Sequence, residues 1–221
     1  MTPHDNPTPA VCRRCGLCCL KGGPALHTQD ATLVASGVIT RRDLVTLRKG
    51  EPVRENVAGK LAGLTEEMVS IRGGGSGDPD RPFACIFHDA EKQACRIHGH
   101  SPAECRALFC EDTSALEAMY REGRLTRADL IDTGGGLWEL ISFHEESFPA
   151  AAAVRLARSA ATGDSRAAGL LQELAAAEDN FRRLFLERTA APPEELDFYF
   201  GRALAVVCAP FGVDLTKPAK R

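Results

Sequence analysis

Cysteine is the residue type whose number and spacing in this sequence could do chemistry. The chain has 221 residues, and four of its nine cysteines stand together as Cys-x-x-Cys-x-x-Cys-Cys. Three more, at positions 85, 95 and 105, have nine residues between neighbours. The nine are Cys12, Cys15, Cys18, Cys19, Cys85, Cys95, Cys105, Cys110 and Cys208. Thiolates are soft ligands that hold zinc ions and iron–sulfur clusters, so this clustering predicts metal binding.

A disulfide framework is the alternative use of so many cysteines. Such frameworks occur in short secreted chains, whereas this chain is longer and its cysteine count is odd. The start, residues 1–7, has neither the basic nor the apolar part of an export signal. We therefore expect a cytoplasmic protein, because clustered thiols in a reducing compartment are more often metal ligands than bridges.

The first cysteines are expected to form a tight turn. A Cys-x-x-Cys loop directs two sulfurs at one metal, and Gly16 can adopt the positive φ that such a loop needs. The run departs from the bacterial ferredoxin pattern because Cys19 follows Cys18 directly. In extended backbone adjacent side chains point to opposite sides, so Cys18 and Cys19 are not expected to serve one site equally. Either two metal sites share this loop or one thiol is spare.

The later cysteines occupy elements that could bring them back to the first group. We expect Cys85 and Cys95 on the two strands of a short hairpin, and Cys105 in the first turn of a helix, where the helix dipole favours a thiolate. A metal that joined the two groups would close a loop of about 65 residues and so remove much of the entropy of the unfolded chain. The pattern therefore predicts a metal-stapled domain.

Several other residues leave alternatives open. Cys110 would face away from Cys105 on a continuous helix, but it could be an eighth ligand if the helix ends early. His98 and His100 could complete a zinc site or lie outside it. Cys208 falls in an apolar helix end and is expected to be a small buried hydrophobe. The histidines with no group of ligands around them are His4, His27, His88 and His144.

Turn and cap signals place the elements around the cysteines. Ser101, Pro102 and Glu104 have the spacing of a capping box that starts the helix bearing Cys105. The Gly-rich stretch 73–79 lacks the ending of a phosphate-binding loop, so a plain connector is expected. The other predicted elements are helices at 29–36 and 41–49, strands at 83–87 and 94–98, helices opening at Ser114 and Thr126, and apolar helix faces along 165–188 and 196–207.

The predicted fold is α+β and mostly helical, with a small metal-stapled, cysteine-rich domain that has a short β-hairpin, followed by an amphipathic helical region. Its expected parts are a flexible arm at 1–11, a metal-binding domain at 12–112 and a helical region at 113–221. The 27 Lys and Arg residues against 30 Asp and Glu residues give a charge of −3, which provides no electrostatic footprint for nucleic acid. No apolar run approaches the roughly 18 residues of a membrane span.

Basic residues crowd the cysteines in the sequence. Nearby cations would stabilise an anionic thiolate centre, although a solvated basic surface would look the same in the sequence. These residues are Arg13, Arg14, Lys21, Arg96 and Arg106.

The cysteine run, together with the later segment FACIFHDAEKQACRIHGHSPAECR, resembles the YkgJ-like cysteine-cluster family, a zinc- or iron-chelating domain. The resemblance covers about residues 12–110 and matches Arg106 to the arginine after the last cysteine of the family pattern. His98 stands where the family usually has tyrosine, and Ser101-Pro102 replaces Arg-Pro, so contacts around the site are expected to differ. The chelating positions that the resemblance implies are Cys12, Cys15, Cys18, Cys19, Cys85, Cys95 and Cys105.

Three functions follow from these features. The first is a cytoplasmic metal-binding protein whose cysteines, with Cys110 as an eighth, hold an iron–sulfur cluster, [4Fe–4S] in type, or zinc. The second is a redox or group-transfer enzyme that depends on the cluster, although no acid–base pair or Gly-rich fingerprint marks a substrate site. The third is a zinc-stapled module that binds another protein through its helical half. A protein or redox partner is expected, and neither nucleic acid nor membrane.

Overall fold

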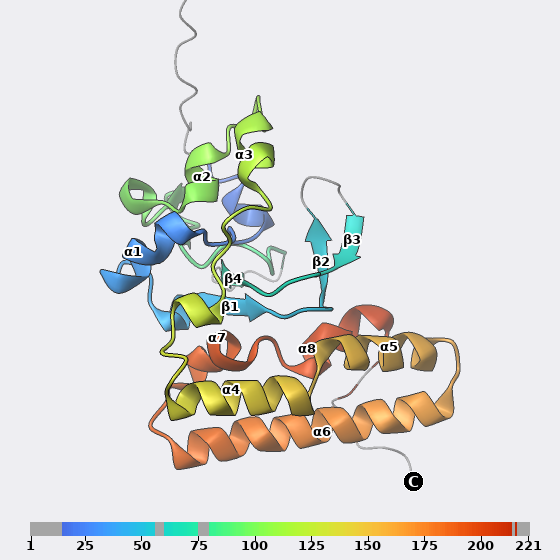
Figure 1. The fold of residues 1–221 in the computed structure, drawn as a ribbon. Helices are drawn as coiled ribbons and strands as arrows, with labels where there is room; N and C mark the ends of the chain where they lie inside the picture. Colours follow the sequence, from blue (N-terminus) through green and yellow to red (C-terminus); the bar gives the residue numbers. More distant parts are fainter. Residues whose placement is uncertain (1–14, 56–59, 75–79, 214, 216–221) are drawn as a thin grey trace, which may run out of the picture.

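The structure, a computed structural model, describes residues 15–55, 60–74, 80–213 and 215. Within that part, the chain forms mostly helices and three small two-stranded antiparallel sheets, which confirms the predicted α+β, mostly helical class. Figure 1 shows the helices between residues 136 and 208 as a layer below the central strands, and the segments 15–35 and 85–119 above those strands. None of the described helices is long and apolar enough to cross a membrane.

The central strands lie where the sequence predicted a helix at 41–49. A 3-10 turn at Arg41–Asp43, capped by Thr40, leads directly into β1 (Leu44–Leu47). Leu44 and Thr46 are fully buried while their neighbours are half-buried, an alternation that belongs to a strand and not to a helix. The prediction was wrong because Leu44 and Leu47 also fit a helical spacing in so short a segment.

Three strands come from the stretch 50–82, in which the sequence showed little periodicity. β1 pairs with β4 (Met68–Ile71), with Leu44 opposite Ile71 and Leu47 opposite Met68. β2 (Pro52–Glu55) pairs with β3 (Lys60–Gly63). All four residues of β4 are buried, so the strand has no polar alternation that a sequence pattern could reveal.

Short helices carry the upper part of the molecule. A 3-10 turn at Thr28–Asp30 continues into α1 (Ala31–Ala35), in agreement with the helix predicted at 29–36. α2 (Ala103–Ala107) begins after Pro102, and α3 (Ser114–Met119) begins at the predicted Ser114. The β-hairpin that precedes α2 in the chain consists of β5 (His88–Asp89) and β6 (Ala94–Cys95), and it is shorter than predicted.

The predicted capping box of α2 does not form, because Glu104 has partners elsewhere. Its carboxylate accepts a hydrogen bond from the Ala25 amide at 2.9 Å and lies 3.2 Å from Nε2 of His27. The fully buried Asp30 caps the helix instead, since its Oδ1 accepts from the Ala103 amide at 2.9 Å. The helix that bears Cys105 is thus fixed by side chains from a distant part of the chain.

The lower layer contains the remaining helices. They are α4 (Gly136–Ser147), α5 (Ala150–Ala161), α6 (Ser165–Arg188), α7 (Leu196–Phe200) and α8 (Leu204–Cys208). α6 has the predicted bounds, and Asp164 caps it through the Ala167 amide at 3.0 Å. Leu171 and Phe185 are buried as predicted, but Leu170 is half exposed. The predicted apolar face at 196–207 is broken at Gly201, whose φ is +69° and beside which the side chain of Arg48 passes.

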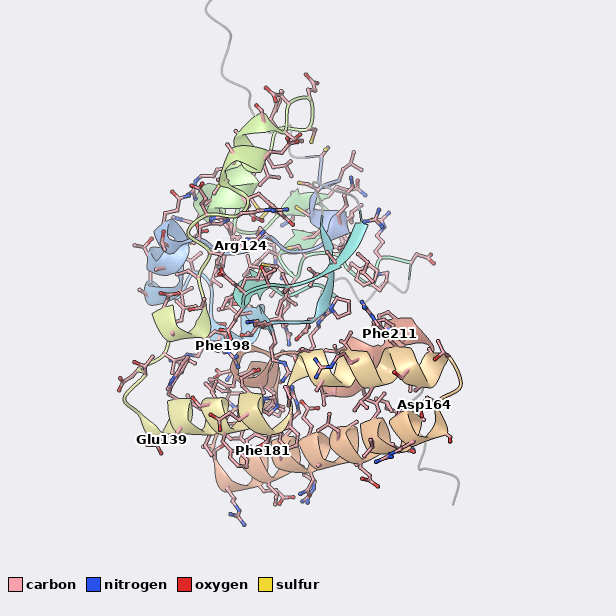
Figure 2. The ribbon with its side chains drawn as sticks, turned by 45° about the vertical axis from the view of Figure 1, so that its right-hand side comes forward. Arg124, Glu139, Asp164, Phe181, Phe198 and Phe211 are labelled. Carbon is pink, nitrogen blue, oxygen red and sulfur yellow. The ribbon has the colours of Figure 1, made fainter. Side chains whose placement is uncertain are left out.

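The main hydrophobic cluster draws residues from both sides of the proposed boundary at residue 112. Leu26 and Val69 from the first side pack in it with Leu125, Ile141 and Phe198 from the second. α7 lies against β1, and the Thr46 hydroxyl donates to the Phe198 carbonyl at 2.6 Å; Figure 2 shows Phe198 between the two layers. The division into two domains stays a prediction, with the two parts joined by one core.

Buried charges lie between the lower helices, where the sequence predicted apolar contacts. Glu178 of α6 accepts from Nε of Arg182 at 2.6 Å and from the Leu204 amide at 3.0 Å, and it lies 3.2 Å from Nε2 of His144. The fully buried Arg48 donates to the Phe148 carbonyl at 3.1 Å. These bonds join the end of β1 to α4, α6 and α8.

Replacing Glu178 with Gln is expected to destabilise the protein by about 3 kcal/mol, because Arg182 stays buried without the carboxylate that balances it. The control is Glu187 of the same helix, whose pair with Arg183 is more than half exposed. Glu187→Gln should therefore change the free energy of unfolding by less than about 0.5 kcal/mol. Urea unfolding measures both values, and equal effects would contradict the importance of the buried pair.

Glu178 also predicts how stability depends on pH. Burial raises the pKa of its carboxyl, but the hydrogen bond with His144 and the charge of Arg182 outweigh burial and lower the pKa from 4.5 to about 2. Because the pKa is lower in the folded state, this contribution is complete above about pH 5 and is lost as the pH falls from about 4.5 to 2. Wild-type stability should fall more steeply over this range than that of Glu178→Gln; parallel curves would refute the assignment.

Candidate metal centre

The first described cysteines lie on a tight turn that rests on the hairpin. Cys15 is exposed, while Cys18 and Cys19 are half-buried, and a 3-10 turn at Cys19–Lys21 closes the loop. Gly16 has φ +72°, as predicted for this position. A Cβ on Gly16 would lie 2.8 Å from Nε2 of His88 and 3.1 Å from the Gln93 carbonyl oxygen. The turn and the hairpin are therefore in direct contact.

A backbone hydrogen bond joins the two groups of cysteines. The Cys85 amide donates to the Cys19 carbonyl at 2.7 Å. Cys85 is also linked to the hairpin, because its carbonyl accepts a hydrogen bond from the His88 amide at 2.9 Å. In the hairpin, His88 stands opposite Cys95. Cys19, Cys85 and Cys95 thus come together from segments that are far apart in the sequence, while Cys85 itself precedes the strand on which it was predicted.

The adjacent thiols of Cys18 and Cys19 are close together. Their Sγ atoms are 4.0 Å apart, and the backbone at Cys18 is helical, with φ −67° and ψ −37°. The expectation that extended backbone would send them to opposite sides was wrong, because successive side chains in a helical turn differ by about 100°. The hydrogen bond between the thiols lowers the pKa of Cys18 to about 6 and raises that of Cys19.

Burial and the charges of neighbouring cysteines raise the pKa of the thiols of Cys85 and Cys105. Burial raises the pKa of Cys85 to about 11. The pKa of Cys105 is also raised, first by burial and then by the charges of Cys85, Cys18 and Cys95. The expectation that the helix dipole would favour a Cys105 thiolate was therefore wrong, since α2 has only five residues and burial dominates. Metal binding at such thiols must release protons, so the affinity should depend on pH.

The remaining cysteines, Cys12, Cys110 and Cys208, differ in whether and how the structure places them. Cys12 lies outside the described residues, as do Arg13 and Arg14. α2 ends at Ala107, which meets the condition for Cys110 to be an eighth ligand, and Cys110 is exposed in the following turn. Cys208 is fully buried in a second hydrophobic cluster with Phe148, as predicted.

The histidines and basic residues that the sequence places near the cysteines differ in exposure and in whether they act on the sulfurs. His98 is half-buried and His100 is exposed, both in a 3-10 turn. Lys21 contributes to the lowered pKa of Cys18, whereas Arg96 opposes the rise at Cys85. Arg106 instead donates to the Ser101 carbonyl. The basic residues around the site are thus only partly directed at the sulfurs.

The thiols of Cys18, Cys19, Cys85 and Cys95 lie on neighbouring segments, but they do not form a coordination sphere as they lie. Within residues 15–55, 60–74, 80–213 and 215, no three His, Cys, Asp or Glu side chains form a group that could hold a metal ion as they lie. The chemistry of the site still fits a thiolate-bound metal. Two sulfurs lie 4.0 Å apart, further cysteines flank them, and His88, which sequence reasoning missed, has a buried Nδ1 with no hydrogen-bond partner among the described residues.

The comparison with known proteins concerns this half of the chain. Residues 11–120 match the family model CxxCxxCC, described as "Putative zinc- or iron-chelating domain". No curated protein matches the chain, and no solved structure matches it either. The family match includes both groups of cysteines that the Cys85 to Cys19 hydrogen bond joins.

Replacing Gly16 with Ala should destabilise the protein by more than the strain of its positive φ alone. Gly37 is the matched control, since its φ is +75° but nothing lies within 4 Å of the position of its Cβ. Gly37→Ala is expected to cost about 1–2 kcal/mol. Gly16→Ala is expected to cost about 1–3 kcal/mol more, because the methyl group meets His88 and the Gln93 carbonyl. Urea unfolding compares the two, and equal costs would mean that the turn does not rest on the hairpin.

Proposed function

The chain belongs, through residues 11–120, to the CxxCxxCC family of zinc- or iron-chelating domains, and from this we propose that it binds metal through thiolates of both cysteine groups. The observation that carries the proposal is the 2.7 Å hydrogen bond from the Cys85 amide to the Cys19 carbonyl, which brings the groups together. The proposed ligands are drawn from Cys12, Cys15, Cys18, Cys19, Cys85, Cys95 and Cys105, with Cys110 as an eighth.

We propose an iron–sulfur cluster, [4Fe–4S] in type, as the first form of the metal. Seven or eight thiols exceed the four that one structural zinc ion needs. In such a cluster four cysteines suffice, which leaves room for Cys19 to act as a hydrogen-bonded neighbour of a Cys18 ligand. A bound cluster would supply one-electron chemistry, so the partner would be a redox protein of the cytoplasm.

Zinc is the second candidate, and one distance favours it. Tetrahedral zinc with Zn–S bonds of about 2.3 Å has neighbouring sulfurs about 3.8 Å apart. The Sγ atoms of Cys18 and Cys19 are 4.0 Å apart, so both could bind the same ion with little movement. In that case the metal would staple the cysteine-rich half together, and the role would be to present a surface to a protein partner.

Metal analysis of matched cysteine variants tests the proposal. Cys85 and Cys208 are both buried, and burial raises the pKa of each to about 11, but only Cys85 lies beside the other cysteines. When purified without oxygen, the wild-type protein and the Cys208→Ser variant should contain the same amount of metal. Cys85→Ser should lose at least half of it, because a buried ligand is removed.

The outcomes separate the candidates. A brown protein whose visible absorption is bleached by dithionite would support the iron–sulfur form. A colourless protein with bound zinc would support the zinc form. Wild-type protein that retains neither iron nor zinc would refute the proposed function. Equal metal loss in the two variants would refute the ligand assignment.

A further inference from the structure

His88 is a buried polar side chain beside the cysteines. It is 4% exposed, and its Nδ1 has no hydrogen-bond partner within the described ranges 15–55, 60–74, 80–213 and 215. A buried polar atom left unpaired costs about 1–3 kcal/mol, and such atoms in folded proteins usually have a function or an unseen partner. The position of this imidazole therefore needs an explanation other than core packing.

The other buried histidines show what a structural role looks like in this chain. His27 has Nδ1 at 2.7 Å from the Glu122 carbonyl oxygen and Nε2 at 3.2 Å from Glu104. His144 has Nδ1 at 3.5 Å from Arg48 and Nε2 at 3.2 Å from Glu178. Both ring nitrogens of each are thus engaged, which distinguishes them from His88.

The surroundings of His88 are the candidate ligands. Cys95 stands directly opposite it in the antiparallel hairpin, so the two side chains share a face and their Cβ atoms are about 5 Å apart. The other edge of the ring, at Nε2, packs against Gly16 of the Cys15–Cys18 turn. At that separation of Cβ atoms, an imidazole nitrogen can reach a cysteine sulfur.

We propose that His88 is a positioning residue of the metal centre, whose Nδ1–H donates a hydrogen bond to the metal-bound thiolate of Cys95. This rests on the proposed function. A thiolate carries negative charge and accepts such a bond better than a thiol does. The bond would orient the sulfur and spread its charge, as partners of metal ligands do elsewhere, so that the centre holds its metal more tightly.

Three substitutions at this position separate the two ring nitrogens. The amide nitrogen of Asn is as many bonds from Cα as Nδ1, and that of Gln is as many as Nε2. His88→Asn therefore keeps a donor at the proposed place, His88→Gln moves it, and His88→Leu removes it. His100→Leu, in an exposed turn, controls for the loss of a nearby imidazole.

Metal-free protein is titrated with Zn²⁺ against a chromophoric chelator, and urea unfolding confirms that each variant is folded. We expect Leu and Gln at position 88 to weaken the affinity about 10–100-fold at unchanged zinc per chain. Asn at this position and the His100→Leu control should bind as wild type does.

An Asn variant as weak as the Leu variant, or a Leu variant equal to wild type, would overturn the inference. A lower number of zinc ions per chain in all three variants would also overturn it, because His88 would then be a ligand. Failure of the wild type to bind zinc, together with absence of native metal, would instead refute the proposed function. The two failures are therefore distinguishable.

Discussion

The hydrogen bond from the Cys85 amide to the Cys19 carbonyl fixes the distance between two groups of cysteines that are far apart in the chain. The contact of Gly16 with the imidazole of His88 is the second link, and it depends on a backbone conformation that glycine adopts without strain. Together they place the first turn over the hairpin that bears Cys95. Without this placement the thiols would be separate groups, and a shared metal centre could not form.

Other polar contacts hold the elements that carry the site. Asp30 and Glu104 fix the helix of Cys105 through hydrogen bonds to the Ala103 and Ala25 amides, and these bonds cross between distant segments. Below them, the buried pair of Glu178 and Arg182 is part of a network that connects the strands to the lower helices. The cysteine-rich half is therefore supported by a core that it shares with the helical half.

The sequence predicted local features better than contacts between distant segments. Helix 165–188, the positive φ of Gly16 and the burial of Cys208 follow from nearby residues, and the structure confirms them. The strand at 44–47 and the capping of α2 by Asp30 could not be predicted, because each depends on a partner far along the chain. His88 was missed for the same reason, since only the fold brings it to the cysteines.

Alkylation of cysteines with and without bound metal tests most directly whether both groups share one centre. Metal-loaded and chelator-treated protein are alkylated, and mass spectrometry gives the extent of reaction at each cysteine. One addition of metal should protect Cys18 in parallel with Cys85 and Cys95, and the chelator should release all three together. Protection of Cys18 alone, or of Cys85 and Cys95 while Cys18 reacts as in metal-free protein, would contradict a shared centre.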